Sequence, residues 1–468
     1  MIIRQRVRRS GLIVAIGSCL AAHVLLVAGC ADVRRDVRDR VDDTVDAIAR
    51  STTPAAPRDT ATIRREPDLR VRISRQVETK RLAGPERFVV RPASGTATAP
   101  SQKARTLAGP MTITSGDRGI RIKDAHGVES DWGFGLDLDI LASDGTLDGA
   151  AEAPSESLQL EGRLIPGFIT VRAAWSENPA RFDVIATMPV ESYLPGVLGK
   201  ELIRSWPRQA FEAQAVAART YALQERRRAR NDGKLVDVED TTADQVFEGT
   251  SSLMVAVEAT RATRGWTLTD DGSLIRAYFS SQCGGRPASA ARAWTTGSPL
   301  AMNRVEPLQA KPRQAYCQRS PLHRWTIERS ADDFHKRLRA WGRSKGRDLT
   351  TLTRVRSIDV RDRNEAGRPD TYSIVTDSGR EYAMAPEELR EAANWSVPGL
   401  EPITRENRFH SGDVEVIVRA DSVRVIGRGF GHGVGMCQWC AKGMAESGMD
   451  WRSMIEQFYP GVDVRKMY

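Results

Sequence analysis

Glu201 is a candidate proton donor because apolar residues flank it in the chain. It follows Val197–Gly199 and precedes Leu202–Ile203, so we expect the carboxyl group to be partly buried. Burial raises the pKa of a carboxyl group and keeps the acid protonated near neutral pH. Lys200 and Arg204 would act in the opposite direction if they approached it. Taken by itself, a single glutamate is more often solvated in a surface ion pair.

His432 is a second candidate, since it stands between Gly431 and Gly433. Flanking glycines let the backbone come close to a ligand and orient the imidazole ring. The ring could bind substrate or stabilise charge, or it could make a structural hydrogen bond. The pattern leaves both roles open.

The chain contains six cysteines. Cys19 falls in an apolar N-terminal run, and Cys30 follows it. The other four allow three disulfide pairings. Cys437 and Cys440 form a Cys-x-x-Cys pair that, with His432, could indicate a zinc or redox site, although one such pair is weak evidence.

The N-terminus has the pattern of an export leader. Arginines precede an apolar run that ends in Val27-Ala28-Gly29-Cys30, which resembles a bacterial lipobox. We therefore expect a lipoprotein signal peptide over residues 1–29, lipidation of Cys30, and export with lipid anchoring to the cell envelope, on its periplasmic or extracytoplasmic face. The alternatives are plain secretion and an uncleaved anchor. The formal charge of +9 suits an anionic partner but does not identify one.

The elements that must position these residues follow from periodicity. Residues 30–105 are polar and rich in Arg, Asp and Pro, which predicts a tether. Alternating apolar residues predict a β-rich lobe over 106–181. An Ala-rich helix is expected over 208–230, and Asp450 should cap a short helix that begins at Trp451. We expect the remaining boundaries to define a core at 182–296 and 423–468, separated by an insertion at 297–422.

Three stretches closely resemble the SpoIID/LytB family. They are residues 190–223, residues 277–286 followed by Trp294, and residues 427–445 followed by Phe458–Gly461. The segment 240–249 also looks like the family's sequence at that place. The resemblance covers about 182–294 and 423–468, whereas the preceding lobe and the insertion match loosely.

The resemblance implies a peptidoglycan lytic transglycosylase that acts on glycan strands stripped of stem peptides. The family's catalytic glutamate falls on Glu201. One carboxyl group suffices, because it first protonates the glycosidic oxygen and then deprotonates the C6 hydroxyl that closes an anhydro ring. A hydrolase would need a second carboxylate, and Glu191 or Asp244 remains a possible partner.

The resemblance also suggests residues that bind substrate, for each of which a structural hydrogen-bonding role is the alternative. Arg219 and Tyr221 are the weakest of them, and Trp206 and Trp439 could stack on sugars or lie in the core. The candidates are His432, Gln438, Gln245, Ser280, Ser281, Gly284, Gly285, Arg219 and Tyr221.

Some family members bind zinc through Cys and His near segment 240–249, which contains neither residue type here. We therefore expect no metal and no cofactor. Cys283 and Cys317 are expected to form a disulfide that fixes the insertion, with Cys437 and Cys440 free or paired.

These expectations combine into an α+β fold. A β-rich body should carry the Ala-rich helix. The C-terminal Gly-rich segment, which begins at Gly427, should close a substrate groove. The alternative function is a non-catalytic peptidoglycan-binding protein that enhances a cell-wall amidase. A Cys/His metallohydrolase is a third possibility, and nucleic-acid binding is the weakest, because interleaved aromatic and basic patches are missing. The expected partners are peptidoglycan and the membrane through the lipid, with a cell-wall amidase as the partner in the alternative function.

Overall fold

The computed structural model describes residues 65–93, 103–116, 119–133, 136–142, 158–173, 180–241, 244–294 and 300–468. All of them belong to one compact unit, Asp59–Tyr468. The predicted leader, the lipidation site Cys30 and the first part of the tether lie outside the described residues. No helix within these ranges has both the length and the apolar character needed to cross a bilayer.

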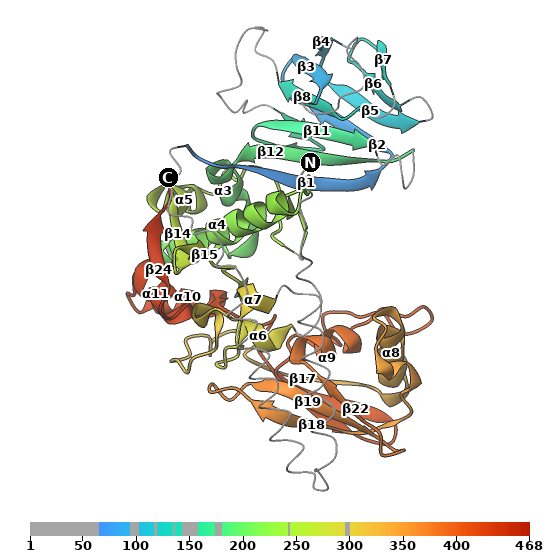
Figure 1. Ribbon diagram of the computed structural model, residues 1–468, viewed down its shortest axis with the longest axis vertical. Helices are drawn as coiled ribbons and strands as arrows, with labels where there is room; N and C mark the ends of the chain where they lie inside the picture. The colour runs from blue at the N-terminus through green and yellow to red at the C-terminus, as the bar shows by residue number, and fades with distance from the viewer. Residues whose placement is uncertain are drawn as a thin grey trace, which may run out of the picture. The chain divides into compact units, whose positions relative to one another are not determined.

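Two antiparallel sheets form the N-terminal β body (Figure 1). The seven-stranded sheet has the order β13-β1-β12-β11-β8-β3-β4, and the six-stranded sheet has the order β10-β9-β2-β5-β6-β7. All neighbouring strands in them are antiparallel except β1 and β13, which are parallel. The strands are β1 Asp68–Val77, β2 Thr79–Ala83, β3 Arg87–Pro92, β4 Arg105–Ala108, β5 Met111–Gly116, β6 Gly119–Lys123, β7 Glu129–Trp132, β8 Leu138–Ala142, β9 Gln159–Leu160, β10 Arg163–Leu164, β11 Phe168–Ala173, β12 Phe182–Pro189 and β13 Val238–Glu239.

The tether prediction is wrong for residues 68–92, which form β1, β2 and β3. Leu69, Val71 and Ile73 alternate with polar residues along β1 and are buried. This is the period of a strand with one covered face. The arginines between them made the segment look like a solvated tether. The β-rich lobe therefore begins near residue 68 rather than at 106.

The Ala-rich helix is α4 (Arg208–Asn231), which confirms its prediction. Pro207 is the N-cap of α4. The small buried side chains of α4 let this helix pack against α3 (Val190–Glu201), α5 (Met254–Ala262), α10 (Gln438–Glu446) and α11 (Trp451–Phe458) (Figure 1). The predicted cap of α11 is also confirmed, since the Asp450 carboxylate accepts from the N–H groups of Arg452 and Ser453. Small elements complete this region: β14 Trp266–Asp270, β15 Ser273–Leu274, β16 Phe279–Ser280, α6 Ala290–Ala293, α7 Leu300–Asn303, η1 Glu306–Leu308, β23 Met436–Cys437 and β24 Asp463–Lys466.

The predicted insertion forms a six-stranded sheet with its own apolar core. The strand order is β17-β22-β21-β18-β19-β20. The elements are β17 Arg324–Ser330, α8 Ala331–Ser344, η2 Asp348–Thr351, β18 Val355–Arg363, β19 Pro369–Thr376, β20 Glu381–Met384, α9 Pro386–Ala393, β21 Val414–Val418 and β22 Ser422–Arg428. Because β22 pairs with β17 and β21, the sheet extends past the predicted boundary at 422 and runs directly into the Gly-rich segment.

Strands outnumber helices and both contribute to the packed core. The α+β class is therefore confirmed at this level.

Candidate active site

Glu201 is the last residue of helix α3. The sequence did not indicate this helix, because Pro195, Gly196 and Gly199 are poor helix formers. The glycine at 196 has a packing reason. A Cβ there would stand 2.2 Å from the carbonyl oxygen of Gly249, so only glycine lets the backbone at Gly249 lie directly on α3.

The Glu201 carboxyl group is half-buried and accepts one hydrogen bond, from Nε2 of Gln438 to Oε2 at 3.0 Å. Leu198, Leu202 and Trp206 belong to an apolar cluster on the same stretch of chain. Burial raises the pKa of Glu201, and the amide of Gln438, which favours the carboxylate, opposes this rise. Among the described residues, Oε1 has no hydrogen-bond partner, so it is the oxygen left to carry an exchangeable proton.

The cations next to Glu201 in the chain do not pair with it. Lys200 bonds to Glu248 on the surface, and Arg204 is exposed. Lys200 and Arg204 therefore do not lower the pKa of Glu201. Burial, which raises this pKa, is the largest effect on it.

The two carboxylates considered as partners of Glu201 are engaged elsewhere. Glu191 lies ten residues earlier on α3, about 15 Å along the helix axis, and forms a two-pronged ion pair with Arg219 at 2.8 and 2.9 Å. Asp244 accepts from the hydroxyl of Tyr221 at 3.0 Å and from the backbone N–H of Glu239 at 2.9 Å. Among the described residues, no hydrogen bond joins either carboxylate to Glu201.

The Gly-rich segment meets the loop after β16 through paired backbone. Strands β16 and β23 pair in parallel, with Ser280 opposite Cys437. The hydroxyl of Ser280 accepts from the N–H of Gly433 at 3.2 Å, and the carbonyl of Ser281 accepts from Trp439. Gly284 and Gly285 adopt positive φ values in the same loop. These residues lie together, and the contacts of the two serines are structural hydrogen bonds.

His432 lies in this segment but does not reach Glu201. Its ring lies tilted against Trp294 and edge to face with Tyr278, at centroid distances of 5.1 and 5.9 Å. Its Nδ1 accepts from the N–H of Val434 at 3.0 Å. Burial lowers its pKa to about 4, so the ring is neutral near pH 7. Within the described residues no hydrogen bond, ion pair or ring contact joins His432 to Glu201, and the role of His432 in binding substrate stays a prediction. Gln438, six residues further along the chain, is the residue that contacts Glu201.

Three other predicted binding residues are buried in structural contacts. Arg219 is fully buried against Glu191, and Tyr221 bonds to Asp244 and to Arg276. Gln245 accepts from the hydroxyl of Tyr193 and donates to the carbonyl of Ala218, which joins α3 to α4. Arg219, Tyr221 and Gln245 therefore hold the helices in place, and the prediction that they face substrate is wrong.

Trp206 and Trp439 pack edge to face, with ring centroids 5.2 Å apart. Trp206 is buried, whereas Trp439 is partly exposed. Trp439 directly follows Gln438, so of the two rings it is the one that can face a ligand beside Glu201.

The predicted disulfide is wrong, because Cys283 and Cys317 are free thiols. Cys437 and Cys440 are also free, and all four sulfur atoms lie within 4.8 Å of one another. Pairing these residues two by two could not anticipate one shared cluster.

Arg368 is a site residue that the sequence did not indicate. It lies between strands β18 and β19 of the insertion and is 1% exposed. Its guanidinium group donates to the backbone carbonyls of Cys283, Arg286 and His432. One guanidinium group thus binds both the loop after β16 and the Gly-rich segment. Nothing distinguished it in a chain with many arginines.

The fold and the site define a class: an α+β protein whose candidate chemistry depends on one carboxyl group at a helix end, opposite a Gly-rich segment. Comparison with known proteins extends this description. Residues 178–269 match the SpoIID family, described as Stage II sporulation protein, and residues 301–435 match a domain of unknown function (DUF8618).

Similar proteins agree with the first of these matches. An uncharacterised protein of Brachyspira hyodysenteriae is 29% identical over 60% of this chain and 68% of its own length. Stage II sporulation protein D of Bacillus subtilis is 26% identical over 60% of this chain and 75% of its own. The amidase enhancer of Bacillus subtilis is 26% identical, and only 39% of its length is covered. The match of residues 178–269 and these similarities support the assignment of the chain to the SpoIID/LytB family.

Proposed function

We propose that this protein is a lytic transglycosylase that cleaves the glycan strands of peptidoglycan, with Glu201 as its single acid and base. The observation that carries the proposal is the state of Glu201: it is half-buried, has a raised pKa, is held through Oε2 by Gln438, and has no cationic partner among the described residues. A carboxyl group in these conditions retains its proton until a substrate accepts it.

The chemistry requires only this group. Protonated Oε1 gives its proton to the glycosidic oxygen as the bond from C1 to that oxygen breaks. The resulting carboxylate then takes the proton of the C6 hydroxyl, and O6 bonds to C1 to form the anhydro ring. No water is consumed. Since Glu191 and Asp244 are bound elsewhere, the second carboxylate that a hydrolase uses is not provided by either.

We further propose that the substrate strands lack stem peptides and that the protein is exported and anchored by a lipid on Cys30. The first proposal rests on the resemblance to the family, and the second on the N-terminal sequence pattern. Incorporation of labelled fatty acid that is lost in Cys30→Ser tests the anchor.

Product analysis tests the enzymatic proposal. Purified protein is incubated with peptide-free glycan strands, and the products are identified by mass spectrometry. We expect anhydro-muramic ends from the wild type and a fall of about 10²- to 10⁴-fold in their rate of formation for Glu201→Gln. Glu248→Gln, which changes a nearby exposed carboxylate, is the matched control and should keep full activity.

Folding of the Glu201→Gln variant must be measured alongside activity. Because the folded state raises the pKa of Glu201, ionising this group lowers stability as the pH rises above its ordinary pKa. The amide removes that loss, so the variant should be at least as stable as the wild type near neutral pH. Inactivity together with a melting temperature far below that of the wild type would leave misfolding as the explanation and contradict this expectation.

The second candidate function is enhancement of a cell-wall amidase without glycan cleavage, which the similarity to an amidase enhancer favours. In that case the purified protein would release no anhydro-muramic product. It would raise the rate at which a purified amidase removes stem peptides, and Glu201→Gln would do so equally well.

A further inference from the structure

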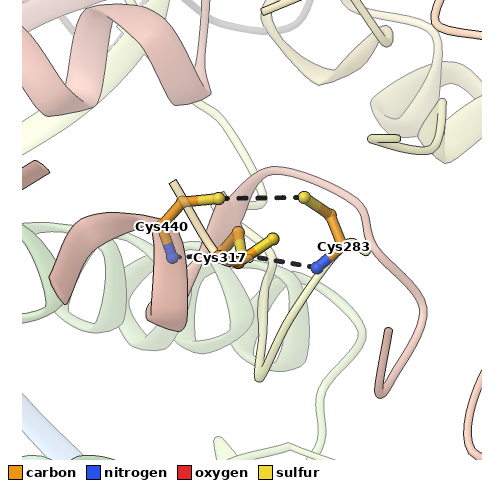
Figure 2. A group of neighbouring side chains, drawn as sticks. Cys283, Cys317 and Cys440 are labelled. Atoms are coloured by element: carbon orange, nitrogen blue, oxygen red, sulfur yellow. Dashed lines mark hydrogen bonds between the residues drawn. The ribbon is translucent and has the colours of Figure 1, made fainter. Parts of the chain in front are cut away.

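The four thiols beside the Gly-rich segment come from three separate parts of the chain. Cys283 follows β16, Cys317 precedes β17, and Cys437 and Cys440 stand at the start of α10. Each is at most 1% exposed. Figure 2 shows the sulfur atoms of Cys283 and Cys440 facing each other, at 3.9 Å. Isolated buried cysteines behave as small apolar residues. Four cysteines that converge from three segments are instead a set of candidate metal ligands.

We propose that Cys283, Cys317, Cys437 and Cys440 bind one zinc ion in a structural tetrathiolate site. Zinc in such sites is tetrahedral with Zn–S bonds of about 2.3 Å, which makes each edge of the sulfur tetrahedron about 3.8 Å. The 3.9 Å between the sulfurs of Cys283 and Cys440 and the 4.8 Å limit on all six sulfur–sulfur distances agree with this size.

The distances between the sulfur atoms and the type of ligand also argue against a disulfide or an iron–sulfur cluster at this place. A disulfide needs sulfur atoms about 2.05 Å apart, and the four thiols are free. An iron–sulfur cluster places several iron and sulfide atoms between its cysteines, so their sulfurs stand further apart than around a single ion. Four thiolates in a small tetrahedron fit zinc, which has no geometric preference of its own to oppose them.

The surroundings suit a thiolate cluster. The sulfur of Cys437 accepts the backbone N–H groups of Cys283 and Cys440, both at 3.3 Å. Such donors orient metal ligands and stabilise their charge. Zinc binding releases the four thiol protons to solvent and leaves two net negative charges. Arg368, whose guanidinium donates to the carbonyl of Cys283, supplies positive charge close by.

A metal here would serve a part of the fold with little regular structure. Strands β16 and β23 are two residues long, and Cys317 lies in an irregular segment between η1 and β17. One ion would join all three segments. Gln438 stands between two of the ligands, so the same ion would fix the side chain that holds Glu201. The metal site itself does not depend on the proposed enzymatic function.

Metal analysis of the purified full chain tests the site. After washing with a weak chelator, we expect about one zinc per chain in the wild type and almost none in Cys317→Ser or Cys440→Ser. Met444→Leu is the matched control, since it changes a buried side chain of the same helix and should keep its zinc. Cobalt, exchanged for zinc, should give the thiolate charge-transfer and tetrahedral bands of a four-sulfur site.

If the cysteine variants fail to fold, the wild type still decides the matter. Stripping zinc with a strong chelator should lower its melting temperature by roughly 10 °C or more, and added Zn²⁺ should restore it. Wild-type protein that carries no metal and whose four thiols are free or joined in disulfides by alkylation and mass spectrometry would overturn the proposal. A zinc-loaded protein that cleaves no glycan would refute the enzyme and leave the zinc site standing.

Discussion

The two side chains that meet at the candidate site are held by regions of different construction. Glu201 ends α3, which packs against the 24-residue helix α4 and α5. The buried ion pair between Arg219 and Glu191 and the bridge through Gln245 join these helices. Helix α3 also contributes buried residues to two apolar clusters, so stability on this side is spread over many packed side chains.

Gln438 is held differently. It follows a two-residue strand and a segment in which Gly429, Gly431, Gly433 and Gly435 all have positive φ values. Backbone hydrogen bonds, Arg368 and the four thiols fix this segment. Glu201, the proposed proton donor, is thus placed by the packing of many side chains, whereas Gln438 depends on a few specific contacts, so the two sides should fail in different ways.

The largest effect is expected on the helical side, for Arg219→Met. This change leaves Glu191 buried without its ion-pair partner and should lower the free energy of unfolding by about 3–5 kcal/mol. Chemical denaturation measures it. Adding Glu191→Leu should recover much of the loss, because no unpaired charge then remains. Lys442→Met, which breaks an exposed pair with Glu446, is the control and should change stability by about 1 kcal/mol or less.

The next effect concerns the Gly-rich side, for Gly435→Ala. A Cβ at this position would stand 2.2 Å from the carbonyl oxygen of Tyr278, in a backbone with φ of +66°. Gly448 also has a positive φ but nothing within 4 Å, so Gly448→Ala reports the conformational cost alone, about 1–2 kcal/mol. Gly435→Ala should cost more than this in denaturation and should also lower glycan cleavage. Equal losses for the two variants would show that close packing at 435 is unimportant.

A smaller effect is expected at the link itself, for Gln438→Leu. The amide of Gln438 lowers the pKa of Glu201 against the effect of burial, so its removal should raise that pKa further. Since the acid must be protonated to start the reaction, the fall of activity at high pH should move to higher pH. Loss of orientation should lower kcat about tenfold. A pH profile of the same shape and midpoint as the wild type would argue against the link.

The remaining effect should appear only in the pH dependence of stability, for His432→Gln. Burial lowers the pKa of His432 from 6.5 to about 4. In that interval the unfolded chain binds a proton that the folded chain does not, so the folded state loses stability as the pH falls from 6.5 towards 4. The variant should lose less over the same interval in parallel denaturation curves. His126→Gln, at an exposed position, should follow the wild type.

Sequence reasoning succeeded where local chemistry decides the structure. The Ala-rich helix and the Asp450 cap depend on neighbours in the chain, and both were predicted. Helix α3 was missed because Pro195 and Gly196 are poor helix formers, and only the packing of segment 240–249 explains the glycine. Strand β1 was missed because its arginines masked an alternating pattern.

The site shows the same division. The resemblance brought Glu201 and Gln438 to attention, and the structure joins them by a hydrogen bond. Arg219 was misplaced, because its ion pair with Glu191 depends on how α3 crosses α4. Arg368 and the convergence of the four cysteines could not be predicted, since both arise from contacts between segments more than 30 residues apart.

The continuity of β22 with the Gly-rich segment has a consequence for engineering the protein. The six-stranded sheet of the insertion could be taken for a separate module that can be deleted and replaced by a short linker. Its removal would take away β17 and β21, the two neighbours of β22, together with Arg368 and Cys317. The truncated chain would keep every residue that resembles the family, yet lose the scaffold on which Gln438 is mounted.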